Sequence, residues 1–531
     1  MEWNLNENLR KSADKFPNRN ALTFESKSIT YSELNDQVDC VAFNLASNGL
    51  REGNKVALIL GNCPEFVISY YGILRAGGVV VPINPIYTHD EISYILSNSQ
   101  TKAVIAHSAL ESQITTIQTE LKHIEKVYYV GSNKTEYIWE QLIENNKNDY
   151  NYPLILDEDL AVILYTSGTT GKPKGAMLSQ RNLASNAESV AKLVEFKEED
   201  SILAVLPMFH IFCLSVCINA PIMCGANIVI GQKFNPNEVI HTIKNEKVTL
   251  FAGVPTMYSF LLQINDCSAE HFQSIRACLS GGASLPVELL QKFEEKYKVN
   301  ILEGFGCTET APVTAFNPIK GIRKAGSVGV DVPGVKNKVV DPYGNEVPRG
   351  EIGELIVKGP NIMMGYLDMP EATSSALKDG WFHTGDLAKM DKEGYIYIVD
   401  RMKDMVIVGG YNVYPREVEE VLYQHPAVVE AAVIGIPDPV FGEQIKAFVV
   451  SNDELVSSHD ILLFCKDKLA KYKVPREIEL LSELPKNSTG KILRRALRAS
   501  IDSKVNATTN SNLSHTIKEE PIAQSYIKPS H

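Results

Sequence analysis

The chain has 531 residues and a formal net charge of −12 at pH 7, from 52 basic and 64 acidic residues. This length exceeds what one hydrophobic core usually holds, so we expect at least two domains, and the negative charge argues against nucleic acid as the main partner. Nine cysteines without a C-x-x-C pair, no signal-peptide pattern and no apolar run near 18 residues predict a cytoplasmic protein without a transmembrane segment.

The first 155 residues or so alternate strand-like and helical patterns. Residues 56–60 form an apolar run that predicts a buried strand, residues 64–76 have helical spacing, and residues 79–82 resume a strand. Thr88 with Glu91 predicts the capped start of a further helix. Strands that alternate with helices in this way favour βαβ units and a parallel sheet.

A glycine-rich loop follows the apolar run 160–164, which predicts a buried strand. Its glycines allow tight turns that point N–H groups inward, and its hydroxyls and lysines add donors and charge, a combination that suits phosphate. It is not a Walker loop, because Lys172 is followed by Pro173. A plain surface turn is the structural alternative. The candidate nucleotide-binding residues here are Thr166, Ser167, Gly168, Thr169, Thr170, Gly171, Lys172 and Lys174.

The α/β pattern continues beyond the loop and then changes twice. Helical spacing over 182–194 is followed by a series of strand-like runs, at 202–207, 226–230, 250–254 and 277–279. Short strands broken by Gly and Pro over about 321–400 predict a β-rich subdomain. A second domain is expected to begin near residue 400, with elements at 416–423, 428–434 and 461–469. The polar residues 501–531 predict a disordered tail.

The loop resembles the signature loop of adenylate-forming enzymes, the superfamily of acyl-CoA synthetases, luciferases and peptide-synthetase adenylation domains. The resemblance covers residues 20–500 and is closest to bacterial long-chain fatty-acid–CoA ligases, through residues 311–318 and 400–420. It implies a large α/β N-terminal domain, residues 1–400, of two doubly wound subdomains and a β-barrel. A small mobile α+β C-terminal domain, residues 401–500, would follow.

Two glycine motifs acquire roles through this resemblance. Gly281, Gly282 and Ala283 fall where adenine stacks and the acyl pocket begins. The run from Gly304 to Glu309 resembles the family's Gly-Tyr-Gly-x-Thr-Glu motif, which implies that Gly304, Phe305 and Gly306 bind the nucleotide, that Thr308 contacts the α-phosphate and that Glu309 holds magnesium. Phe305 replaces the usual tyrosine, so stacking on adenine is retained and the phenol hydrogen bond is not.

Four later residues match the family's ribose site and hinge. Asp386 fits the ribose-binding aspartate, and Arg401 resembles the residue that contacts ribose and phosphate. Ile398 lies between them in the sequence and is included in the nucleotide site. Lys403 matches the hinge about which the small domain rotates between two half-reactions. The structural alternatives are a turn aspartate and a solvated lysine.

The remaining candidates serve the acyl carbonyl and the thiol. Lys491 matches the lysine that bridges carboxylate and α-phosphate, and Gly409 and Gly410 match the pantetheine tunnel. His210 matches a histidine that lines the carbonyl region, although a satisfied core histidine is the common alternative among apolar neighbours. The apolar side chains that we expect to suit an acyl chain are Phe209, Phe212, Val216, Val254, Met257 and Tyr258.

The implied enzyme is a carbon–sulfur ligase that uses ATP, Mg²⁺ and coenzyme A to convert a medium- or long-chain fatty acid into acyl-CoA through acyl-AMP. An aryl-CoA ligase, an acyl-AMP ligase that loads a carrier protein, a luciferase-type oxygenase and a non-catalytic nucleotide or lipid sensor remain alternatives. We expect small-molecule substrates and no nucleic acid. The resemblance also allows peripheral membrane contact and a homodimer, for which the sequence has no motif of its own.

Overall fold

The computed structural model describes residues 3–132, 138–144, 152–166, 173–453, 455–487 and 490–501. Its internal contacts divide the chain into two units, which comprise Met1–Lys403 with Ser488–Lys491, and Asp404–Asn487 with Ile492–His531. Most of the predicted tail, from residue 502 on, lies outside the described residues. Within the described ranges, no helix is both long enough and apolar enough to cross a membrane.

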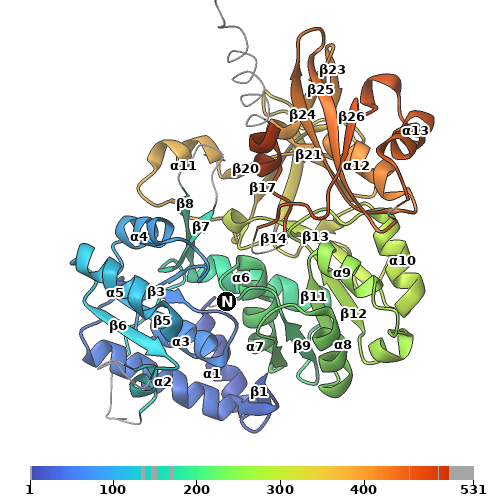
Figure 1. The fold of residues 1–531 in the computed structure, drawn as a ribbon. Helices are drawn as coiled ribbons and strands as arrows, with labels where there is room; N and C mark the ends of the chain where they lie inside the picture. Colours follow the sequence, from blue (N-terminus) through green and yellow to red (C-terminus); the bar gives the residue numbers. More distant parts are fainter. Residues whose placement is uncertain are drawn as a thin grey trace, which may run out of the picture. The chain divides into compact units, whose positions relative to one another are not determined.

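The larger unit contains a nine-stranded sheet (Figure 1). Its central strands are parallel, and the two edges end in antiparallel pairs. In sheet order the strands are β15 (Val330–Asp331), β14 (Val313–Phe316), β13 (Ile301–Gly306), β12 (Ala277–Ser280), β11 (Leu250–Gly253), β9 (Ser201–Ala204), β10 (Asn227–Ile230), β1 (Asn20–Phe24) and β2 (Lys27–Thr30). The helices around it are α1 (Leu5–Lys15), α6 (Gln180–Val194), α7 (Ala220–Cys224), α8 (Pro236–Asn245), α9 (Pro255–Leu262) and α10 (Val287–Tyr297).

The larger unit also contains a seven-stranded sheet. Its order is β18 (Gly365–Tyr366), β8 (Lys174–Ser179), β7 (Leu160–Thr166), β4 (Val79–Pro82), β3 (Lys55–Ile59), β5 (Ala103–His107) and β6 (Lys126–Val130). Alternate β3 residues face two different cores, Val56 and Leu58 one and Ala57 and Ile59 the other, so the strand is apolar throughout. The helices are α2 (Tyr31–Ser47), α3 (Pro64–Arg75), α4 (His89–Asn98) and α5 (Glu111–Glu120).

The β-rich segment after residue 321 forms a five-stranded antiparallel sheet. It contains β16 (Lys336–Val340), β17 (Gly353–Lys358), β20 (Trp381–Met390), β19 (Leu377–Lys378) and β21 (Ile396–Arg401). The helix α11 (Pro370–Ala376) precedes β19. This sheet belongs to the larger unit and supplies residues to the candidate site below.

The smaller unit is α+β. Its strands are β23 (Tyr411–Val413), β22 (Val406–Val408), β25 (Gly442–Ser451), β24 (Val428–Asp438) and β26 (Glu477–Leu480), with helices α12 (Pro415–Tyr423) and α13 (Ser458–Lys468). Val418 and Leu422 of α12 pack into one core with Val433 and Ala447 of the long β24–β25 pair. The predicted α/β class, with a large sheet-containing N-terminal domain and a smaller C-terminal one, is thus confirmed.

Local signals explain most element boundaries. The helix predicted over 182–194 begins two residues earlier because Ser179 caps it: Ser179 Oγ accepts the Asn182 N–H at 3.2 Å, and Asn182 Oδ1 accepts the Ser179 N–H at 2.9 Å. The predicted Thr88 cap is confirmed by the same reciprocal pair with Glu91. The sequence analysis did not predict the π-helix Cys213–Asn219, labelled η3, because apolar periodicity does not distinguish it from an α-helix.

Candidate active site

The glycine-rich loop joins β7 to β8, which pair antiparallel so that Thr166 faces Lys174. Thr166 Oγ1 donates to the Lys174 carbonyl at 3.5 Å, so a hydrogen bond connects the two residues that flank the loop. Six predicted loop residues lie outside the described residues: Ser167, Gly168, Thr169, Thr170, Gly171 and Lys172. The loop leaves β7 at its carboxyl end, and since β7 runs parallel to β4, this is the sheet edge where ligands usually bind in α/β folds.

Glu309 lies in a short turn, η5 (Thr308–Thr310), that follows β13. Its main-chain carbonyl accepts the Met363 N–H at 2.9 Å, and its Oε1 accepts the Tyr366 hydroxyl at 2.9 Å. Burial, together with the Glu309 charge, raises the pKa of Tyr366 well above its ordinary value, so this phenol remains a proton donor. Tyr366 was not among the sequence candidates, because no local pattern links it to a turn 57 residues earlier.

The donor set around Glu309 fits Mg²⁺ only in combination with a nucleotide. In the described parts of the chain, no three His, Cys, Asp or Glu side chains are grouped so as to hold a metal ion. Mg²⁺ usually takes one or two carboxylates and completes its octahedron with substrate phosphates and water. With Oε1 engaged by Tyr366, Glu309 would offer Oε2 to such an ion, while Thr308 lies next to it on the same half-buried turn.

Close packing accounts for two of the predicted glycines. A Cβ on Gly304 would lie 2.2 Å from Phe316 Cδ2, and one on Gly306 would lie 1.9 Å from the Pro312 carbonyl oxygen, so β13 needs both to pair with β14. Gly281, Gly282 and Ala283 come directly after β12, as expected of a strand-to-helix turn.

A buried carboxylate in this turn's neighbourhood holds it in place. Glu303, on β13, accepts the Leu285 N–H at 3.0 Å through its Oε1. A Cβ on Gly281 would be 3.4 Å from the Phe212 ring, so the turn borders the segment that carries His210.

Asp386 and Arg401 face each other across β20 and β21, with 3.0 Å between Arg401 Nε and Asp386 Oδ1. Asp386 is almost fully buried, and this burial raises its pKa above the ordinary value, although the Arg401 and Lys491 charges oppose the rise. Phe305 and Ile398 both pack, half-buried, against one small core in this sheet region. The structure therefore places the predicted adenine-covering and ribose-binding candidates within one unit.

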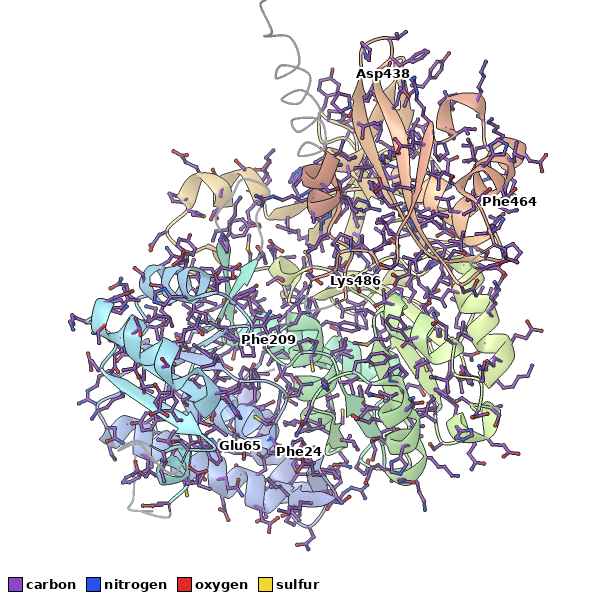
Figure 2. All side chains as sticks on the ribbon, in the orientation of Figure 1. Phe24, Glu65, Phe209, Asp438, Phe464 and Lys486 are labelled. Carbon is purple, nitrogen blue, oxygen red and sulfur yellow. The ribbon has the colours of Figure 1, made fainter. Side chains whose placement is uncertain are left out.

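His210 follows Phe209, a half-buried residue against the main core that Figure 2 labels within the larger unit. Its Nδ1 accepts the Phe212 N–H at 3.3 Å. Burial, and then the nearby Lys491 charge, lowers the pKa of His210 to about 4, so the imidazole is neutral at pH 7. Lys491, although it comes late in the sequence, belongs to the larger unit and acts electrostatically on both His210 and Asp386.

Three predicted residues lie at or beyond the unit boundary. Lys403 is an exposed residue in the turn Met402–Asp404, and the larger unit's main segment ends on it. Gly409 and Gly410 join β22 to β23 in the smaller unit, with φ values of +57° and +87°. The Gly409 N–H donates to the Phe441 carbonyl at 2.9 Å. These roles, like those of the other site residues, stay predictions.

A small gap between apolar side chains of the larger unit has no polar lining and is too small to hold a water molecule. Of the residues predicted to suit an acyl chain, Val216 lines it. Leu279, two residues before Gly281 in the sequence, also lines this gap. Val216 belongs to η3 and follows Phe212 by one helical turn. The complete lining is Val190, Leu193, Val194, Val216, Leu279 and Phe316.

Comparison with known proteins places this geometry in context. The family description "AMP-binding enzyme" matches residues 9–367, and "AMP-binding enzyme C-terminal domain" matches residues 417–491. The chain is 40% identical to a long-chain-fatty-acid–CoA ligase of Bacillus subtilis, over 92% of this chain and 93% of that protein. It is 35% identical to a feruloyl-CoA synthase of an Amycolatopsis species, over 91% and 96%. The crystal structure of ATP-bound MatB from Rhodopseudomonas palustris superposes with a TM-score of 0.89 at 35% identity, over 94% of this chain and 99% of that one.

Proposed function

The chain belongs to the AMP-binding enzyme family as an AMP-forming acid–thiol ligase, and we propose that its acid substrate is a medium- or long-chain fatty acid. The acid oxygen attacks the α-phosphorus of ATP, and the bond to pyrophosphate breaks, which gives acyl-AMP. The thiol of coenzyme A then attacks the acyl carbon, and AMP leaves.

The first step brings a carboxylate against a triphosphate, so cations and donors must offset their repulsion. In this proposal the β7–β8 loop, with Thr166 and Lys174 at its ends, holds the terminal phosphates, and Thr308 donates to the α-phosphate. Lys491 lies between the incoming carboxylate and that phosphate. Mg²⁺ held by Glu309 would neutralise phosphate charge.

The nucleoside would contact residues of the nine-stranded and the five-stranded sheet, both in the larger unit. Phe305 and the Gly281–Ala283 turn would sandwich adenine, with Ile398 and the glycines of β13 beside it, and Asp386 and Arg401 would hold the ribose. His210 is neutral at pH 7 and so would line the carbonyl region without adding a charge.

The apolar core beside the Gly281 turn is the observation that carries the choice of a fatty acid. Phe212 borders this turn, and Val216 and Leu279 belong to the same core. An alkyl chain gains from such apolar surroundings without leaving a polar group unpaired. The similarity to the B. subtilis ligase supports the same choice. An aryl acid is the second candidate, favoured by the similarity to a feruloyl-CoA synthase.

The proposal is tested by AMP release with ATP, Mg²⁺ and coenzyme A over a panel from acetate to palmitate with benzoate and ferulate, each with and without coenzyme A. We expect CoA-dependent turnover that peaks on a fatty acid. A peak on ferulate or benzoate would reject the fatty-acid assignment. Acyl-AMP formation without any thioester formed on added coenzyme A would indicate a carrier-protein acceptor. No AMP release with any of the acids would indicate a sensor.

A further inference from the structure

The segment that includes β18 binds to two parts of the candidate site at once. On one side, the Met364 and Leu367 N–H groups donate to the Met177 and Gly175 carbonyls, at 2.9 and 2.8 Å. This pairing adds β18 to β8, the strand that leaves the phosphate-binding loop. The segment is therefore placed by main-chain bonds that do not depend on the Tyr366 hydroxyl.

The same segment also holds the η5 turn. The Met363 N–H donates to the Glu309 carbonyl at 2.9 Å, and Asn361 Nδ2 donates to the Thr310 carbonyl at 2.7 Å. These bonds determine where the turn lies. They do not determine how the Glu309 carboxylate is rotated, because both go to main-chain atoms.

Tyr366 is the residue that acts on the carboxylate itself. Its hydroxyl donates to Glu309 Oε1 at 2.9 Å, and its buried ring has the Lys174 ammonium 5.1 Å from its centroid. A cation at this distance from an aromatic ring is attracted by it. One side chain thus contacts both the candidate magnesium ligand and the lysine at the exit of the phosphate-binding loop.

We propose that Tyr366 is a positioning residue for Mg-ATP: its hydroxyl holds Oε1 of Glu309 so that Oε2 faces the metal, while its ring seats Lys174 beside the phosphates. This inference rests on the role proposed above for Glu309. Partners that orient a metal-binding carboxylate typically change metal affinity by about 10- to 100-fold when they are removed.

Tyr366→Phe is the informative change, since it removes the hydroxyl and leaves the ring, the strand pairing and the contact with Lys174. Binding of the non-hydrolysable nucleotide α,β-methylene-ATP to the full-length protein is measured by calorimetry at a series of Mg²⁺ concentrations and in EDTA. We expect the Mg²⁺ concentration for half-maximal affinity to rise about tenfold, with the affinity in EDTA unchanged.

A matched control and a double-mutant cycle separate positioning from packing. Tyr297→Phe removes another buried phenol, which donates to the Leu261 carbonyl at 2.6 Å, and should leave the Mg²⁺ requirement unchanged. Glu309→Gln should raise the Mg²⁺ requirement, and adding Tyr366→Phe to it should have no further effect, because Tyr366 acts through Glu309.

Three results would overturn the inference. The first is a Tyr366→Phe variant with the same Mg²⁺ requirement as the Tyr297→Phe control, while Glu309→Gln raises the Mg²⁺ requirement. This result would remove the role of Tyr366 and leave the role of Glu309 intact. The second is a loss of nucleotide affinity that is equal with and without Mg²⁺, or that adds to Glu309→Gln, which indicates a packing role. The third is an unchanged requirement in Glu309→Gln, which also removes Glu309 from the proposed function.

Discussion

At the scale of single residues, the charge of Lys491 acts on His210 within the larger unit and disfavours its protonation. Burial, and then the Lys491 charge, disfavours the protonated imidazole, and the pKa of His210 falls to about 4. The histidine therefore has no positive charge in the neutral range, so in the proposed first step Lys491, and not His210, meets the charge of the incoming carboxylate. This difference in charge supports different roles for the two residues in the first half-reaction.

Lys491→Ala tests this division. We expect carboxylate-dependent ATP–pyrophosphate exchange to fall by about 100-fold or more, while thioester formation from supplied acyl-AMP persists. The pKa of His210 should rise, because a positive neighbour is removed, and NMR of ¹³C-labelled histidine can follow it. Lys486→Ala is the control, since Lys486 is ion-paired with Glu430 at 2.7 Å in the smaller unit. Equal loss of both half-reactions would reject the role of Lys491.

At the scale of secondary-structure elements, the pairing of β13 with β14 places the nucleotide candidates. Gly306 lies at the end of β13, where its register with β14 shifts between Phe305 and Gly306. The strand's other side chains, including Phe305, are directed by this pairing. The glycine is thus explained by packing, and its effect on a nucleotide would be indirect.

Gly306→Ala tests this explanation, because its Cβ would lie 1.9 Å from the Pro312 main-chain oxygen, which cannot give way as cheaply as the end of a flexible side chain. We expect a marked fall in the thermal midpoint, from a cost of about 1–3 kcal/mol or more, together with weaker ATP binding. Gly61→Ala is the control, since its φ is not in the left-handed region and no heavy atom lies within 4 Å of the added Cβ. Normal stability with lost ATP binding would instead indicate direct contact between Gly306 and the ligand.

At the scale of the whole molecule, the chain consists of two units with separate cores, and the main boundary falls after Lys403. The candidates for adenylation lie in the larger unit, whereas Gly409 and Gly410 lie in the smaller one. A ligase with two half-reactions can use such a division if the units reorient between them.

Lys403→Pro tests the hinge. Proline fixes φ at 403 and restricts the residue before it, so rotation about this point should be impeded. We expect adenylation to persist and thioester formation to fall at least about tenfold, as measured by single-turnover kinetics of each half-reaction. Lys403→Ala removes the ammonium and keeps the rotation, so it should resemble the wild type. A parallel loss of both half-reactions in the proline variant would reject the hinge.

The sequence by itself determined the α/β class, several buried strands and helices, the family and the order of the site motifs. Such features depend on near neighbours: an apolar run predicts a strand buried on both faces, and Thr88 with Glu91 caps a helix wherever that helix packs. The loop residues Ser167 to Lys172 remain predictions outside the described residues.

Only the tertiary structure decided which distant residues meet. Asp386 faces Arg401 because two strands pair in one register, and Tyr366 reaches Glu309 because β18 adds to the edge of β8. The π-helix is likewise a product of packing. Register and side-chain packing depend on contacts between segments far apart in the chain, and local sequence patterns carry no information about them.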